Sequence, residues 1–124
     1  ALLAEKVKEF KPDYVLLLGW MRILTDSFIA SFKDRLINLH PALPGTFPGT
    51  EAIERQYEAF IKGEISRCGI MTHFVPDEGV DSGPVIFTEE VPVFKGDRLE
   101  DFEKRVHEAE HRLVIKTLKF LSKV

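Results

Sequence analysis

The sequence of 124 residues predicts one α/β domain with a mixed sheet. Helical and strand patterns follow one another in the order helix, strand, helix, strand, helix, strand, strand, helix. Hydrophobic residues make up 44% and charged residues 30% of the chain, which is typical of a globular protein and argues against disorder. This length suffices for a single hydrophobic core.

The N-terminal part of the chain is predicted to alternate between helix and strand. Apolar residues recur at helical spacing in residues 1–10. The apolar run at 14–18 is typical of a strand covered on both faces, as in a parallel sheet. Thr25 can cap a short helix, and residues 36–40 form a second strand that Pro41 ends.

A shaped loop and a helix are predicted after the second strand. Residues 41–49 contain three prolines and two glycines, which is typical of a loop with a fixed course. Thr50 can cap a helix over 51–62 that ends at Gly63. The predicted apolar face of this helix consists of Ile53, Tyr57, Phe60 and Ile61.

Two further strands and a long helix are predicted in the C-terminal part. Strand patterns at 69–75 and 85–93 flank a turn-rich loop at 76–84. Asp97 and Glu100 resemble a capping box at the start of the last helix. The predicted apolar stripe of that helix consists of Leu99, Phe102, Val106, Ala109, Leu113 and Phe120.

Composition and charge restrict the partners and the compartment that we expect. The net charge is −3 and the chain has no basic run, which argues against a nucleic-acid partner. No apolar stretch approaches the roughly 20 residues that span a bilayer, so we expect no membrane contact. The lone cysteine, Cys68, cannot form an internal disulfide. We therefore expect a soluble cytoplasmic protein.

Asn38 and His40 are the first candidates for a chemical role. Side chains alternate along a strand, so both point to the same face near the strand's end. In open α/β sheets, ligands bind at the carboxyl ends of strands. An amide can hydrogen-bond an oxygen that becomes negative, and an imidazole can move protons near neutral pH. From spacing alone, a hydrogen-bonded structural pair at the strand end is the alternative interpretation, because a polar pair this short is common.

Acidic residues in the loop at 76–84 are the next candidates. Asp81 lies between two glycines, which permit a backbone turn that aims its side chain. A carboxylate near His40 would favour the protonated imidazole and fix its orientation. By residue chemistry alone, Asp77 and Glu78 are equal candidates, and an ordinary turn aspartate is the alternative interpretation.

The remaining titratable residues indicate no metal site. The chain has no cysteine pair and no His-Glu-x-x-His motif, so we expect no catalytic metal. His73 lies in an apolar strand and is interpreted as a core or pocket-edge histidine. Glu110 falls beside the apolar stripe of the last helix, where it can face a pocket rim or solvent, and His107 lies one turn earlier on a more exposed face.

An ordered set of short motifs covers nearly the whole chain. The motifs are Gly19-Trp20-Met21-Arg22-Ile23-Leu24, Ile37-Asn38-Leu39-His40-Pro41-Ala42-Leu43-Pro44, Pro48-Gly49, His73-Phe74-Val75, Val80-Asp81-Ser82-Gly83-Pro84-Val85-Ile86, and Arg105-Val106 with Glu110-His111. In this order they resemble the glycinamide ribonucleotide transformylase family. The resemblance implies a formyltransferase-like three-layer fold with a mixed, mostly parallel sheet.

The resemblance also implies that residues 1–124 form one partial catalytic domain. The family begins with a strand and a Gly-Ser-rich loop, which binds the substrate phosphate at a helix N-terminus. No such loop precedes the strand at 14–18 in this sequence. We therefore expect the N-terminal half of the Rossmann-like fold, with its phosphate-binding segment, to be missing. An incomplete sheet could drive self-association.

The activity implied is transfer of a formyl group from 10-formyltetrahydrofolate to the amine of glycinamide ribonucleotide in purine biosynthesis. Asn38 would stabilise the oxyanion, His40 would transfer protons, and Asp81 would orient His40. Glu110 would hold the ribose hydroxyls, with His107 at the rim. The folate site implied by the resemblance consists of Met21, Arg22, Ile23, Leu24, Asn38, Pro76, Asp77, Glu78, Gly79, Val80 and Asp81.

Three alternatives stay open at this point. A formyltetrahydrofolate deformylase would use water as the acceptor, and methionyl-tRNA formyltransferase shares the same Asn-x-His and Asp logic. A folate-binding module without catalysis is the third alternative. Retention of Asn38, His40 and Asp81 together argues against a decayed site.

Overall fold

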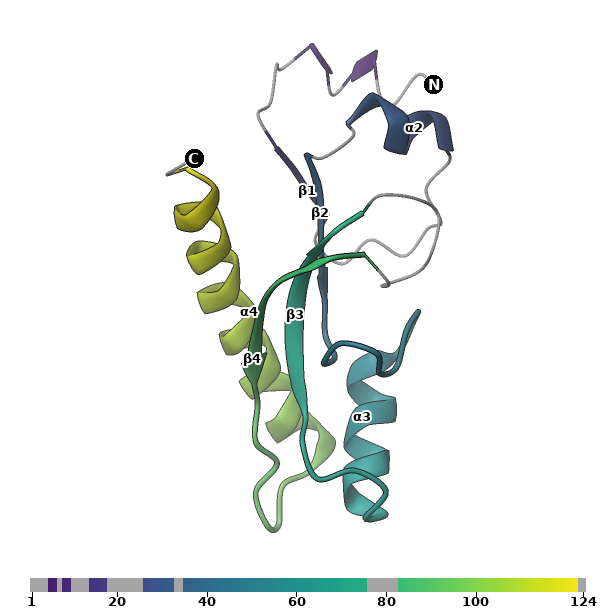
Figure 1. The fold of residues 1–124 in the computed structure, drawn as a ribbon. Helices are drawn as coiled ribbons and strands as arrows, with labels where there is room; N and C mark the ends of the chain where they lie inside the picture. Colours follow the sequence, from purple (N-terminus) through teal and green to yellow (C-terminus); the bar gives the residue numbers. More distant parts are fainter. Residues whose placement is uncertain are drawn as a thin grey trace.

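The computed structural model describes residues 5–6, 8–9, 14–17, 26–32, 35–75 and 83–122. Their strands form one sheet in the order β1-β2-β3-β4 (Figure 1). The strands are β1 (Val15–Leu17), β2 (Leu36–His40), β3 (Gly69–Phe74) and β4 (Val85–Glu90). The helices are α2 (Asp26–Ser31), α3 (Ala52–Ile61) and α4 (Leu99–Leu121). The predicted α/β class and order of these elements are confirmed.

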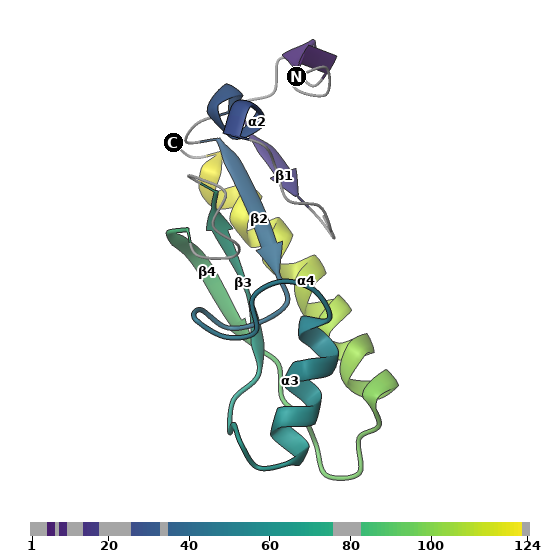
Figure 2. The ribbon, with the colours of Figure 1, turned by 90° about the vertical axis from the view of Figure 1, so that its right-hand side faces the viewer.

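The sheet is mixed, as predicted. β1 pairs with β2 in parallel, whereas β2 with β3 and β3 with β4 pair antiparallel. A mostly parallel sheet was expected, but among the described strands only the β1–β2 pair is parallel. The reason is the position of α3, which lies beyond the end of β2 rather than alongside the sheet (Figures 1 and 2). β3 consequently starts at the end of the sheet where β2 stops, and runs back beside it.

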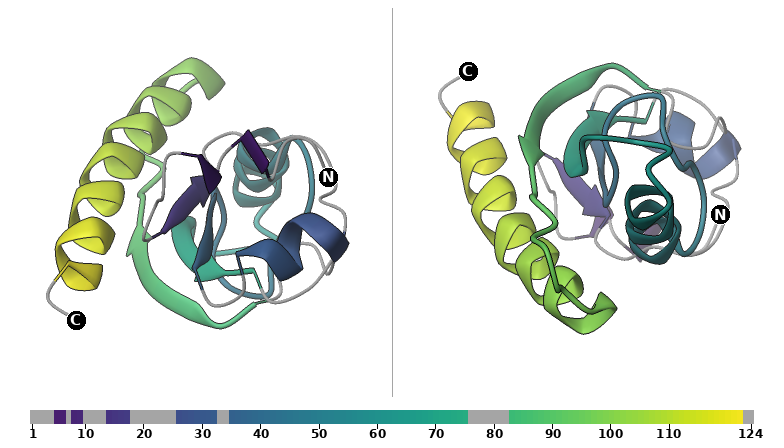
Figure 3. Two further views of the ribbon diagram at one scale, coloured as in Figure 1. Left: turned by 90° about the horizontal axis from the view of Figure 1, so that it is seen from above. Right: turned by 90° about the horizontal axis from the view of Figure 1, so that it is seen from below.

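Helices cover both faces of the sheet, which gives three layers (Figure 3). On one face, Leu39 and Ile70 share a buried cluster with Phe102, Val106 and Leu113 of α4, among others. On the other face, Leu36 and Leu17 share a buried cluster with Ile29 of α2 and with Phe32, which directly follows that helix. Because side chains alternate along β2, Asn38 and His40 lie on the α2 side and Leu39 lies on the α4 side.

The buried stripe of α4 differs from the predicted one in its last two turns. Phe120 is half exposed, and Thr117 and Leu121 are the buried residues there. A step of four residues from Leu113 reaches Thr117 and Leu121, which keeps them on the buried face. The Thr117 hydroxyl donates to the Leu113 carbonyl at 2.8 Å and lies 2.9 Å from the Thr72 hydroxyl. These hydrogen bonds satisfy the buried hydroxyl of Thr117. The stripe was mispredicted at this end because the prediction considered apolar residues only.

Helix α3 also differs from its prediction in two respects. Ile61 is 59% exposed, whereas Gln56 is fully buried between Ala52 and Ala59. The N-cap is Glu51 rather than Thr50, and its side chain makes no capping hydrogen bond. Gln56 can be buried because both ends of its amide are hydrogen-bonded to main-chain groups.

Candidate active site

A polar cluster lies on the α2 side of the sheet, where β2 meets β3. The register places His73 directly opposite Asn38, and Met71 directly opposite His40. Directly opposed residues in an antiparallel pair project to the same face, so the two histidines and the amide share one surface of the sheet. His40 is 2% exposed and His73 is 1% exposed. Asn38 is the one residue of β2 that is only partly buried.

Asn38 and His73 are joined across the two strands. The Nδ2 atom of Asn38 lies 3.3 Å from Nε2 of His73. The second ring nitrogen of His73, Nδ1, lies 2.9 Å from the carbonyl oxygen of Phe74. The interpretation of His73 as a core or pocket-edge histidine is confirmed by its burial and by these two contacts. The arrangement combines a buried imidazole with an amide that has access to the surface.

The main chain that follows His40 is fixed by Gln56. Its Nε2 donates to the carbonyl of Pro41 at 3.0 Å, and its Oε1 accepts from the Gly69 N–H at 2.6 Å. This one side chain therefore ties the end of β2 to the start of β3. Sequence reasoning missed Gln56, because a polar residue within a helix is ordinarily assigned to the solvent face.

The loop at 41–50 is held against α3 by a second polar side chain. Arg55 Nη2 donates to the carbonyls of Phe47 and Pro48 at 3.1 and 2.7 Å. Its guanidinium carbon lies 5.8 Å from the centre of the Phe47 ring. Gly45 and Gly49 have φ values of +75° and +86°, a region that favours glycine. These contacts confirm that the predicted loop has a fixed course.

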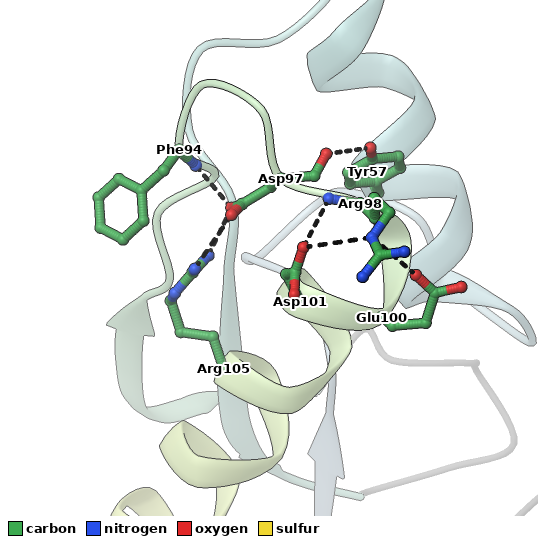
Figure 4. Close-up of polar contacts among 7 residues, drawn as sticks. All are labelled: Tyr57, Phe94, Asp97, Arg98, Glu100, Asp101 and Arg105. Atoms are coloured by element: carbon green, nitrogen blue, oxygen red, sulfur yellow. Dashed lines mark hydrogen bonds and ion pairs between the residues drawn. The ribbon is translucent and has the colours of Figure 1, made fainter.

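The start of α4 is anchored by a hydrogen-bonded group around Asp97 (Figure 4). One carboxylate oxygen of Asp97, Oδ2, accepts from the Phe94 N–H at 2.7 Å and from Arg105 Nη1 at 2.8 Å. The hydrogen bond from Arg105, followed by that from Phe94, lowers the pKa of Asp97. Tyr57 of α3 donates to the Asp97 carbonyl at 2.7 Å. The group therefore fixes α4 to α3 and to the loop after β4.

The predicted capping residue of α4 is displaced by one position. Arg98, not Asp97, is the N-cap, and its N–H donates to the Asp101 carboxylate at 2.9 Å. Asp97 was a plausible cap by residue type, but its carboxylate is already engaged by Arg105 and Phe94. Asp101 consequently takes the part that the sequence pattern gave to Glu100.

The side chains of His107 and Glu110 contact each other on α4. Nδ1 of His107 lies 2.8 Å from Oε1 of Glu110. The side chain of Glu110 is 22% exposed and that of His107 is 65% exposed, which agrees with their predicted places beside the apolar stripe. Within the described part of the chain, neither residue hydrogen-bonds to β2. A surface depression of about 770 Å³ is lined by α4 side chains that include His107, and not by Asn38 or His40.

Several predicted site residues lie outside the described residues. They are Met21, Arg22, Ile23, Leu24, Pro76, Asp77, Glu78, Gly79, Val80 and Asp81. The approach of Asp81 to His40 therefore stays a prediction. Among the residues with described positions, no group of three histidine, cysteine or acidic side chains is placed to hold a metal ion.

Two further features of the described residues bear on the sequence analysis. No helix among the described elements is long and apolar enough to cross a bilayer. Cys68 is buried, and desolvation raises the pKa of its thiol to about 11. The thiol is therefore protonated and unreactive at neutral pH, as expected for a structural cysteine.

Comparisons with known proteins agree with the geometry. A formyl transferase family model matches residues 2–118. The chain is 44% identical to a phosphoribosylglycinamide formyltransferase of Dictyostelium discoideum over 97% of its own length and 61% of that protein. It is 40% identical to the Schizosaccharomyces pombe enzyme of the same name, covering 95% of this chain and 58% of that enzyme.

Solved structures show the same likeness. The phosphoribosylglycinamide formyltransferase of Streptococcus pneumoniae superposes with a TM-score of 0.88 at 37% identity, over 97% of this chain and 64% of that one. The chain thus spans about three fifths of the length of the relatives that it matches. Together with the fold and the polar cluster on β2 and β3, these matches establish that the chain belongs to the formyl transferase family.

Proposed function

We propose that the protein containing this chain transfers a formyl group from 10-formyltetrahydrofolate to the amine of glycinamide ribonucleotide in the cytoplasm. The observation that carries the proposal is the partly exposed amide of Asn38, on the same face of β2 as the buried imidazole of His40. The names of the matched relatives support the same acceptor.

The chemistry requires a hydrogen-bond donor and a group that moves a proton. The amine of the nucleotide attacks the formyl carbon, and the formyl oxygen gains negative charge as the new C–N bond forms. An amide N–H of Asn38 donates to that oxygen, which lowers the barrier because the donor is already in place. The bond from the formyl carbon to the folate nitrogen then breaks. His40 accepts the proton that the amine loses, and a proton is returned to the folate nitrogen.

The other roles rest on the family resemblance. Asp81 orients His40 and favours its protonated form. The residues 21–24 and 76–81 line the folate site. Glu110 accepts hydrogen bonds from the ribose hydroxyls, with His107 at the rim, and the partial exposure of the Glu110 side chain is compatible with this role.

The test is an acceptor assay on the full-length protein. It is incubated with 10-formyltetrahydrofolate, with and without glycinamide ribonucleotide, and the formylated nucleotide and formate are both measured. We expect formylated nucleotide when the acceptor is present and little formate without it. Formate release that does not depend on the nucleotide would instead identify a deformylase.

Two substitutions test the assigned residues in the same assay. His40→Ala and Asp81→Asn are each expected to lower turnover about 100-fold or more, because general acid–base catalysis contributes about that much. Glu58→Gln, on the exposed side of α3, is the matched control and is expected to retain full turnover. Near-normal turnover in either test variant removes that residue from the mechanism.

A further inference from the structure

His73 is buried beside the proposed catalytic amide, yet the reaction above gives it no part. It lies directly opposite Asn38 in the β2–β3 register and is 1% exposed. Its Nε2 faces Nδ2 of Asn38 at 3.3 Å, and its Nδ1 faces the Phe74 carbonyl at 2.9 Å. Each ring nitrogen therefore has a partner of fixed identity.

The hydrogen-bond chemistry of these contacts determines the tautomer of His73. A carbonyl oxygen can only accept, so Nδ1 must carry the proton that is donated to Phe74. In a neutral imidazole, Nε2 is then an acceptor. Only the NH₂ end of the Asn38 amide can donate to it, which fixes the rotation of that amide. The second N–H of the planar NH₂ group is thereby directed along a defined line.

The strand that pairs with β3 at His73 is irregular as well. The β3–β4 register shifts between Thr72 and His73, so that Thr72 opposes Phe87 and His73 opposes Val85. Ile86 is the extra residue of this β-bulge. Bulges bend a strand and change the direction of a side chain, and they are frequent beside active sites. The bulge lies on β4, beside the pairing of His73, which contacts Asn38.

From these observations we infer that His73 is a positioning residue for formyl transfer. It accepts one N–H of Asn38 through Nε2 and so aims the other N–H at the formyl oxygen. This inference rests on the proposed function, because it assigns Asn38 the oxyanion. His73 itself does not touch substrate.

The neighbouring residue Thr72 supplies a matched control. Its hydroxyl is also buried and hydrogen-bonded, at 2.9 Å to Thr117, but it projects to the α4 side of the sheet. Thr72→Val removes a buried hydrogen bond one residue away from His73 without changing the Asn38 contact. It therefore reports what loss of a buried polar contact alone does to the protein.

The test compares His73→Leu, His73→Gln and Thr72→Val in the full-length protein. Leucine removes the acceptor, whereas glutamine can accept through Oε1 and donate through Nε2. We expect His73→Leu to lower kcat about 10- to 100-fold, since a small misplacement of a catalytic group has this effect. The KM for both substrates should stay within about twofold of wild type, as the inference concerns only the transition state. His73→Gln should recover most of kcat, and Thr72→Val should keep it.

A second measurement covers the case in which His73→Leu does not fold. Nitrogen-15 NMR of labelled histidine in the wild-type protein near pH 7 should show the neutral Nδ1–H tautomer for His73. The Nε2–H tautomer or a doubly protonated ring would overturn the inference. So would wild-type kcat in folded His73→Leu, or an equal loss of kcat in Thr72→Val. A wild-type protein that forms no formylated nucleotide would instead refute the proposed function, while the NMR result still reports on the tautomer.

Discussion

Gln56 offers a sharp test of how the end of β2 is held in place. Substitution by methionine keeps the length of the unbranched side chain and removes both hydrogen bonds. The Gly69 N–H then lies buried without its acceptor, and the partly buried Pro41 carbonyl loses its donor. A buried unsatisfied group costs about 1–3 kcal/mol, and a partly hydrated one costs less. Gln56→Met should therefore lower the free energy of unfolding by about 2–4 kcal/mol.

The assay is equilibrium unfolding in urea, followed by far-ultraviolet circular dichroism. Glu58→Met on the exposed side of the same helix is the control, and should stay within about 0.5 kcal/mol of wild type. Because Pro41 directly follows His40, turnover should fall as well in Gln56→Met. A free energy of unfolding equal to that of the control would refute the reasoning, since it would mean that the two main-chain groups find other partners.

Three further predictions concern the core and the start of α4. Phe102→Ala should lower the free energy of unfolding by about 3–5 kcal/mol because Phe102 is fully buried, whereas Phe120→Ala should lower it much less because Phe120 is half exposed. Equal losses in urea unfolding would contradict the buried stripe assigned to α4. Gly69→Ala should lower the melting temperature, because an added Cβ would lie 2.5 Å from both the Glu89 carbonyl oxygen and Leu43 Cδ2. An unchanged melting temperature would contradict this, since it would mean that β4 and Leu43 can move away from the added methyl group at no cost. Asp97→Asn should have a lower melting temperature than wild type at neutral pH, and the difference should shrink below about pH 4. The reason is that a carboxylate with a lowered pKa contributes stability that is lost as the carboxylate is protonated. A difference in melting temperature that does not depend on pH would contradict the pairing with Arg105.

Local patterns in the sequence were sufficient to predict the face of β2 that carries Asn38 and His40. Strand alternation and the proline after His40 determine which side chains share a face and where the strand ends. The long helix α4 and the loop at 41–49 were predicted for equally local reasons, namely a 3.6-residue apolar period and a concentration of proline and glycine.

Features that depend on contacts between distant segments could not be predicted in this way. The partner of Asn38 is His73, 35 positions away, and it is selected by the β2–β3 register rather than by any local pattern. Gln56 and Thr117 can be buried because their polar atoms hydrogen-bond to β3, Gln56 to the Gly69 N–H and Thr117 to the Thr72 hydroxyl. A pattern of apolar residues assigns such side chains to solvent, which is why Ile61 and Phe120 were predicted to be buried in their place.

A crystal structure of the full-length protein with glycinamide ribonucleotide and a non-reactive analogue of 10-formyltetrahydrofolate would show directly whether Asn38 and His40 meet the formyl group. We expect the formyl oxygen to lie within hydrogen-bond distance of Asn38 Nδ2, with the imidazole of His40 beside the amine and Nε2 of His73 still hydrogen-bonded to the Asn38 amide. An analogue seated on the exposed face of α4, or a formyl group remote from both Asn38 and His40, would contradict this expectation.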